Sequence, residues 1–167
     1  MRINASVSGR AGNFAKIPLV NAKLMTEVGD LALSLIRRRT AAGKDVNNAP
    51  FQALSPAYAK QKQKELGHSR ADLTVSGRMV NELGRVGVTE RTVSIGWSGG
   101  GTGSSGSAGG TLIQRSRAVA GADKALFHNI TGAGRSRVKR KFFGLTPEEA
   151  KTIRDRVQAH VSRQVQG

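Results

Sequence analysis

The chain has 167 residues, of which 38% are hydrophobic and 4% aromatic, so it can fill one modest core but not two. Its 27 lysines and arginines against 11 acidic residues give a formal net charge of +16, which favours polyanionic partners such as nucleic acid or an acidic protein surface. The lack of cysteine excludes a disulfide scaffold, thiol chemistry and cysteine-based zinc sites, and the lack of an apolar run of about 18 residues excludes a membrane-spanning helix.

The N-terminal part of the chain predicts an arm followed by a long helix. Residues 1–18 show no hydrophobic periodicity and no apolar signal-peptide segment, so we expect an arm or an edge strand in a soluble protein. Residues 19–42 follow the pattern of an amphipathic helix, whose apolar stripe contains Leu24, Val28, Leu31 and Leu35. Gly43 ends this helix and opens a turn-rich loop over residues 43–54.

A second, short helix is predicted after this loop. Ser55 is suited to cap its first turn and Pro56 to occupy its first position, while Gly67 ends it. Most of its side chains are polar, and its three lysines point in different directions. We therefore expect it on the surface, anchored by Tyr58 and Leu66 alone.

Residues 84–97 carry the best hairpin pattern in the chain, preceded by one or two helical turns at residues 76–83. A loop at Glu90 and Arg91, or a slightly longer one, puts four apolar side chains on one face, and Trp97 continues that face. In this register the facing pairs are Val86 with Ile95 and Val88 with Val93.

Glycine and serine dominate residues 98–110, and such a segment gains too little from burial to offset its ordering entropy. We expect a mobile loop, and no lysine followed by serine or threonine marks it as a phosphate-binding loop. Further on, the pattern predicts a strand at 111–117, a short helix at 121–129 that stops near Gly132, and a strand with one basic face at 137–143.

A capping box marks the start of the last helix. Thr146 is the expected N-cap, Pro147 the first helical residue and Glu149 the reciprocal partner of the cap. The helix carries an apolar stripe formed by Ala150, Ile153, Val157 and Val161.

Two amphipathic helices that bracket several short strands predict an α+β fold. We expect a small, mostly antiparallel sheet packed by the N-terminal and the C-terminal helix. Residues 1–18 are then an arm, and residues 19–167 form a single domain with a flexible insertion at 98–110.

The sequence shows no arrangement of residues that predicts catalysis or metal binding. The three histidines, His68, His128 and His160, lack the spacing of zinc ligands. No pair of carboxylates lies in a setting that would hold a metal or split their pKa values, and no nucleophile elbow occurs. We therefore expect a binding or structural protein without a cofactor, not an enzyme.

Two basic clusters are the candidate contact residues. The first is a run of three arginines near the end of the first long helix, and the second lies on the strand predicted near residue 140. Their members are Arg37, Arg38 and Arg39, and Arg135, Arg137, Lys139, Arg140 and Lys141. The second cluster is the better candidate for an interface with an acidic protein or a surface near DNA. Few aromatic residues are available for base stacking, so a nucleic-acid contact would use backbone charge rather than sequence readout.

Three motifs in a fixed order carry a family resemblance. They are Leu-Ser-Pro-Ala-Tyr at residues 54–58 with Lys62, Leu-Thr-Val-Ser-Gly-Arg-Met at residues 73–79, and Arg-Lys-Phe-Phe-Gly-Leu-Thr at residues 140–146. In this order they resemble the tail-completion or virion-morphogenesis proteins of tailed bacteriophages. The resemblance covers about residues 22–165, and the Gly/Ser segment at 98–110 departs from it.

The resemblance implies a non-enzymatic structural protein of the phage neck, the head–tail connector region. Such a protein forms a six-fold or twelve-fold ring that joins the portal and adaptor to a tail terminator or tail-tube protein, with DNA in its lumen. It implies a location in the virion neck, and in the host cytoplasm during assembly. Short strands with free edges suit pairing between subunits of such a ring. The alternative, based on the net charge of +16, is another kind of nucleic-acid-binding protein without enzymatic activity.

Overall fold

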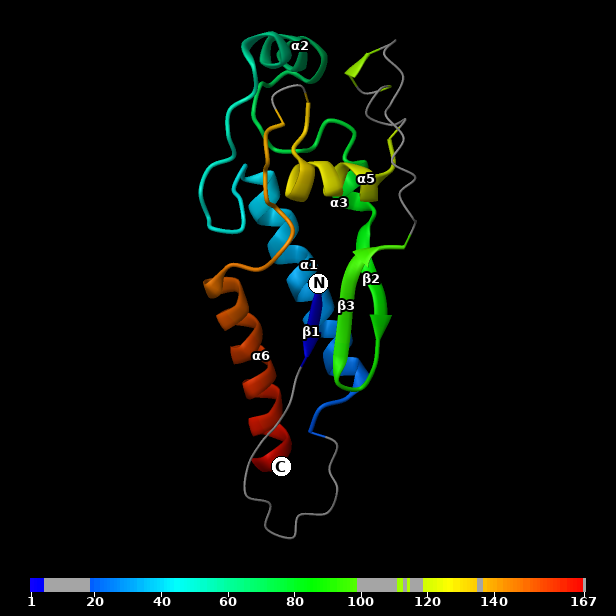
Figure 1. The fold of residues 1–167 in the computed structure, drawn as a ribbon. Coiled ribbons are helices and arrows are strands. Elements are labelled where there is room, and N and C mark those ends of the chain that lie inside the picture. Colours follow the sequence, from blue (N-terminus) through cyan, green and yellow to red (C-terminus); the bar gives the residue numbers. More distant parts are fainter. Residues whose placement is uncertain (5–18, 99–110, 113, 115–118, 135–136, 167) are drawn as a thin grey trace.

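The computed structural model describes residues 1–4, 19–98, 111–112, 114, 119–134 and 137–166. It confirms the α+β fold class, with helices and a three-stranded antiparallel sheet (Figure 1). The elements in chain order are β1 (Arg2–Asn4), α1 (Ala22–Ala41), α2 (Pro56–Leu66), α3 (Arg78–Asn81), β2 (Leu83–Val88), β3 (Thr92–Trp97), α5 (Gly121–Leu126), the π-helix η1 (Phe127–Thr131) and α6 (Pro147–Gln166).

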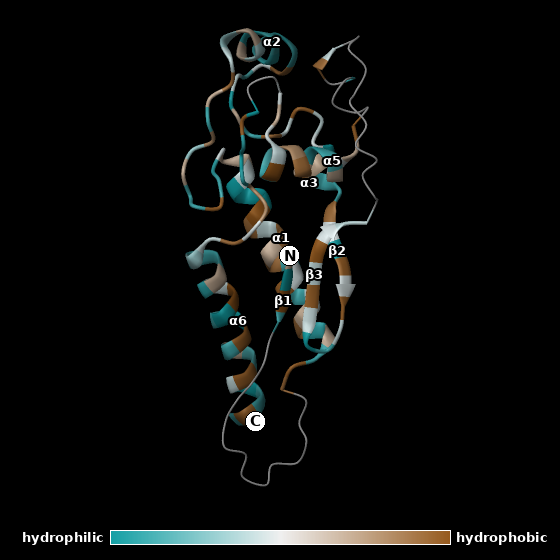
Figure 2. Cartoon of the chain, in the orientation of Figure 1, coloured by the Kyte–Doolittle hydropathy of each residue, from teal (hydrophilic) through white to brown (hydrophobic). Residues whose placement is uncertain are grey.

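Helix α1 is the centre of the core. Its N-cap is Asn21, whose side-chain oxygen accepts a hydrogen bond of 2.9 Å from the backbone N–H of Leu24. The helix packs against β2 and β3 on one side and against α6 on another. Figure 2 shows hydrophobic residues concentrated on α1 and β3. The predicted helix at 19–42 is therefore confirmed, although it begins three residues later and ends one residue earlier than predicted.

The strand order in the sheet is β1-β3-β2, so β3 is central. Strand β1 pairs with β3 antiparallel, and the first residues thus belong to the sheet as an edge strand; residues 5–18 of the expected arm lie outside the described residues. The hairpin is confirmed, with Val88 opposite Val93. The expected position of Val86 was wrong, because a bulge between Arg85 and Gly87 places Arg85 opposite Ile95 and leaves Val86 47% exposed.

The capping box at the start of α6 is confirmed. The backbone N–H of Glu149 donates to Thr146 Oγ1 at 3.1 Å, and Glu149 Oε2 accepts from the backbone N–H of Thr146 at 2.9 Å. We expected both long helices to pack on the sheet, but α6 packs chiefly against α1. Ile153 in its first half is buried, whereas Val165 near its end is 61% exposed.

The strand predicted at 137–143 is absent from the described residues. A single isolated bridge joins Ala133 to Val138, and the backbone that follows pairs with loops and helices instead of a strand. The Arg140 N–H donates to the carbonyl of His128 at 2.8 Å, and the Lys141 carbonyl accepts from Val46 N–H at 2.8 Å. These partners explain the correction, since among the described residues the backbone of this segment bonds to a helix and a loop and to no strand of the sheet.

Aromatic packing fixes the same segment to the sheet. The ring of Phe142 is fully buried and lies edge-on to Trp97, with 6.2 Å between the ring centroids, and the ring of Phe143 is 5.1 Å from Trp97. Trp97 Nε1 donates to the carbonyl of Met79 at 2.8 Å. The end of β3 is therefore the point where α3 and the 140–146 motif meet.

The remaining predictions had mixed outcomes. Helix α2 begins and ends as predicted, although the Ser55 side chain makes no capping hydrogen bond. The predicted helix at 121–129 occurs as α5 followed by η1, and Gly132 ends it. The structure describes three residues of the strand predicted at 111–117, namely Thr111, Leu112 and Gln114, and the last two have helical backbone instead of strand backbone. The insertion predicted at 98–110 lies outside the described residues except for Ser98. No helix within the described ranges combines the length and the apolar character needed to cross a bilayer.

Candidate functional site: a cationic cavity

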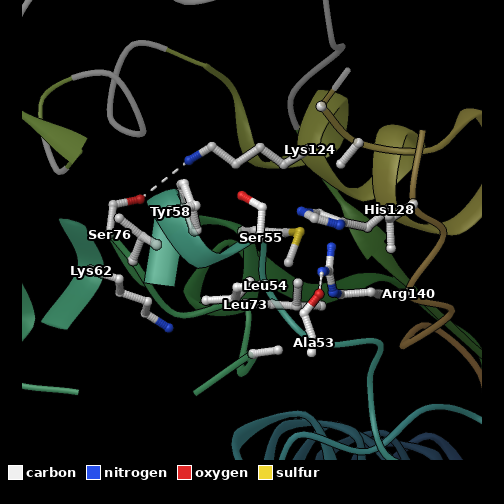
Figure 3. A pocket seen from close by; sticks show the side chains of 16 residues that line it. Ala53, Leu54, Ser55, Tyr58, Lys62, Leu73, Ser76, Lys124, His128 and Arg140 are labelled. Atoms are coloured by element: carbon white, nitrogen blue, oxygen red, sulfur yellow. Dashed lines mark hydrogen bonds between the residues drawn. The ribbon is translucent and has the colours of Figure 1, made fainter. Parts of the chain in front are cut away.

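A cavity of about 460 Å³ lies between α2, α3, α5 and η1. Its walls bring together the three motifs that are separated in the sequence. The first motif contributes Leu54, Ser55, Tyr58 and Lys62, the second contributes Leu73, Val75, Ser76 and Met79, and the third contributes Arg140. Figure 3 shows Ser55, His128 and Arg140 gathered at one end, while Lys124 reaches in from another direction toward Ser76.

Lys62 is the buried side chain of α2, only 1% exposed. Its ammonium group donates to Asp72 Oδ1 and to the carbonyl of Arg70, both at 2.5 Å. Burial by itself raises the pKa of Asp72, but hydrogen bonds from Lys62 and Thr74 outweigh that effect and hold the pKa below its usual value. The charge of Lys62 is thus matched inside the protein and fixes the loop after α2 to the helix.

Arg140 has a different environment, because its partners are neutral. Its Nε and Nη2 donate to the carbonyl of Gln52 at 3.1 and 2.9 Å, and Nη2 also donates to the carbonyl of Ala53 at 3.2 Å. In the described part of the structure, no carboxylate lies within ion-pair distance of this guanidinium. Burial lowers the pKa of Arg140, and the nearby Tyr58 raises it.

His128 and Lys124 complete the polar lining on the α5–η1 side. Burial, followed by the charges of Arg140 and Lys124, lowers the pKa of His128 to about 4, so its imidazole is neutral at pH 7. Burial and the charge of Arg78 lower the pKa of Lys124, while Glu82 raises it. The Lys124 ammonium donates to Ser76 Oγ at 3.2 Å.

The basic residues predicted from the sequence do not form one surface. Arg39 is 5% exposed and donates to the Glu149 carboxylate and to the carbonyls of Phe142 and Gly144, the latter two at 2.6 and 2.9 Å. Arg140 is buried in the cavity wall. Arg37 is exposed but donates to the carbonyls of Val80 and Leu83, at 3.3 and 2.7 Å.

The exposed remainder of the predicted patch is smaller. Its members are Arg38, Arg137, Lys139 and Lys141, and Arg135 lies outside the described residues. Exposed and inward-facing side chains do alternate along residues 137–142, but the segment makes no ladder of strand pairs among the described residues, and Arg137 has a positive φ of 45° that turns the backbone. Arg39 and Arg140 therefore stabilise the fold, and the predicted basic residues that stay exposed are these four and Arg37, whose guanidinium binds two carbonyls.

Sequence reasoning missed the cavity, although one signal for it was present. Tyr58, Lys62 and Leu66 recur every four residues and so share one face of α2. The two apolar neighbours were recognised as anchors, and the lysine between them has to be buried with them. Lys124 and His128 show the same spacing, across the change from α-helix to π-helix.

Within the described ranges, no group of three or more histidine, aspartate or glutamate side chains is placed to hold a metal ion. Comparison of the chain with protein-family models, with curated proteins and with solved structures finds no match.

Proposed function

We propose that this chain is a structural protein of the neck of a tailed bacteriophage, and that it works by assembling into a ring that joins the portal–adaptor complex to the tail around the DNA channel. The observation that carries the proposal is the convergence of its three resemblance motifs. Segments near residues 54, 76 and 140 line one cavity, so the resemblance applies to one folded unit.

The free edge of the sheet supports assembly. Among the described residues no strand pairs with the outer edge of β2, because β3 is central and β1 lies on the other side. The strand is six residues long and exposes Val86 and Val88, which are 47% and 38% exposed. An unpaired edge with apolar side chains is a surface that a second copy can extend.

The four exposed cations Arg38, Arg137, Lys139 and Lys141 suit an acidic neighbouring protein. A channel through which DNA slides gains little from tight phosphate contacts, because each contact releases counterions and slows departure. We therefore assign the exposed cations to a protein interface.

The experiment is deletion of this gene from a phage that carries it. We expect DNA-filled heads and separate tails in place of complete virions, and expression of the wild-type chain in trans should restore joined particles. Imaging of the restored neck should show the chain as a ring between the portal layer and the tail. Joined, infectious particles from the deletion strain would disprove the proposal.

The alternative function, nucleic-acid binding through the net charge of +16, gives a different result. A nucleic-acid-binding protein would bind bare DNA or RNA tightly at physiological salt, with an affinity that falls steeply as salt rises. It would also leave head–tail joining intact when deleted.

A further inference from the structure

We propose that the cavity between α2, α3, α5 and η1 binds a small organic monocarboxylate, with the carboxylate at the end formed by Ser55, His128 and Arg140 and the apolar body against the opposite wall. This inference goes beyond ring assembly and does not depend on it. A cavity of about 460 Å³ lies within the size range of small-molecule sites.

The charge of the lining calls for an anion. Its ionisable side chains are three cations, one imidazole and the phenol of Tyr58, which is neutral at pH 7, and no aspartate or glutamate of the described residues lines it. Asp72 neutralises Lys62, whereas the guanidinium of Arg140 has only carbonyl partners. The cavity thus retains a buried positive charge for which the described structure provides no counter-ion.

The pKa shifts of the cavity side chains are consistent with a buried positive charge in the cavity. Lys124, His128 and Arg140 all have a pKa below the ordinary value, with burial as the first cause in each case. His128 is further affected by Arg140 and Lys124. A bound anion would reduce the mutual repulsion of these groups and raise the pKa of His128.

The rest of the lining favours a carboxylate with an apolar body over inorganic phosphate. Aliphatic and thioether side chains form much of the wall, among them Leu54, Leu73, Val75, Met79 and Val138. A monoanion matches the guanidinium of Arg140, the one arginine among the residues that line the cavity, whereas a phosphate dianion loses more hydration energy on burial. The Ser55 hydroxyl lies at the same end as Arg140 and can donate to a carboxylate oxygen (Figure 3).

The test uses benzoate as the probe and the His128 imidazole as the reporter. The chain has three histidines, so the His128 resonance is assigned by its loss in a His128→Gln variant. We expect saturating benzoate to raise the His128 pKa from about 4 by about one unit, and to leave His68 and His160 unchanged. Benzoate should bind at least about tenfold more tightly than benzamide, which lacks the charge, and than acetate or inorganic phosphate, which lack the apolar body.

A pair of variants distinguishes the effect of a cavity cation on benzoate binding from the effect of a cation elsewhere on the surface. Lys124→Gln removes a cation from the lining and should weaken benzoate about tenfold, while Lys139→Gln makes the same charge change at an exposed position and should have no effect. Ser55→Ala, which removes no capping hydrogen bond, should weaken benzoate severalfold and leaves the fold intact. The proposal fails if benzamide or phosphate binds as well as benzoate, if His128 does not respond, or if both lysine variants weaken binding equally.

Discussion

Two buried cations hold separate parts of the chain together. Lys62 ties α2 to the loop that contains Asp72, and Arg39 ties the end of α1 to the start of α6 through Glu149 and two carbonyls. Both side chains are almost fully enclosed. A buried ion pair is costly when one partner is removed, because the remaining charge is left without compensation.

Lys62→Met should therefore destabilise the protein by about 3–5 kcal/mol, measured as the free energy of unfolding in urea at pH 7. The double variant Lys62→Met/Asp72→Leu should recover most of this loss, because neither charge then remains buried. Lys64→Met, on the exposed side of the same helix, is the matched control and should change stability little. A single variant as stable as the wild type would contradict this role.

The ion pair between Lys62 and Asp72 should also make the free energy of unfolding depend on pH in the acid range. The pKa of Asp72 is lower in the folded protein than in the unfolded chain, so its contribution to stability is complete above its unfolded pKa, about 4. That contribution is lost as the pH falls through the lower, folded pKa. An Asp72→Asn variant should show a shallower fall of unfolding free energy between about pH 5 and pH 2 than the wild type; equal slopes would rule out this contribution.

Close packing of α1 on the sheet depends on one glycine. A Cβ atom at Gly29 would lie 2.8 Å from Val93 Cγ2 and 3.0 Å from Arg85 Cδ. The Arg85 side chain can move, but Val93 is fully buried in β3. The helix and the sheet thus approach each other too closely at this position for any side chain.

Gly29→Ala should destabilise the protein by about 1–3 kcal/mol, although alanine favours a helix by about 1 kcal/mol over glycine. The control is Ser34→Ala on the exposed side of α1, which should be neutral or slightly stabilising. Thermal unfolding of both variants checks the prediction. A Gly29→Ala protein that melts above the wild type would show that α1 can move away from the sheet.

Elements with strong local signals were predictable from the sequence. The periodic stripe of α1, the capping box of α6 and the hairpin turn each depend on residues close together in the chain. The bulge at Arg85–Gly87 and the lack of a strand at 137–143 were not predictable, because both depend on distant partners. The alternation of basic and other residues near Arg140 is typical of a strand with one basic face. The guanidinium of Arg140, however, donates to carbonyls almost 90 residues away in the sequence.

The cavity could be predicted only in part for the same reason. The three motifs were recognised as a set, and the four-residue spacing of Tyr58, Lys62 and Leu66 marked one face of α2. The contribution of α5 and η1 required the fold itself, since Lys124 and His128 belong to none of the motifs.

At the scale of the whole molecule, the free edge of β2 should decide assembly. Val86→Lys should prevent ring formation, because it places a charge on the edge that a second copy would cover. Ile130→Lys makes the same change at another exposed apolar position, 62% exposed, and should still assemble. Light scattering and negative-stain images of particle necks measure both; rings formed normally by the Val86 variant would contradict this interface.

The exposed cations allow a second prediction at this scale. Replacing Arg137, Lys139 and Lys141 by serine should reduce the yield of joined particles more than it affects DNA release from those that form. A control with serine at Lys60, Lys64 and Arg70 removes the same charge from other exposed positions. Normal joining with blocked DNA release would assign the cluster to the channel.

The carboxylate of Glu149 makes two contacts, and together they restrict how α6 can move relative to α1. The same carboxylate closes the first turn of α6 and binds Arg39 at the end of α1, so the base of α6 cannot swivel without breaking both contacts. Only the last turn of the helix, residues 162–166, is exposed throughout, and Val165 is 61% exposed there. The start of α6 is therefore fixed to the end of α1, and the ion pair between Arg156 and Glu27, at 2.8 Å, holds the middle of α6 to the first turns of α1, so the two helices form one rigid pair.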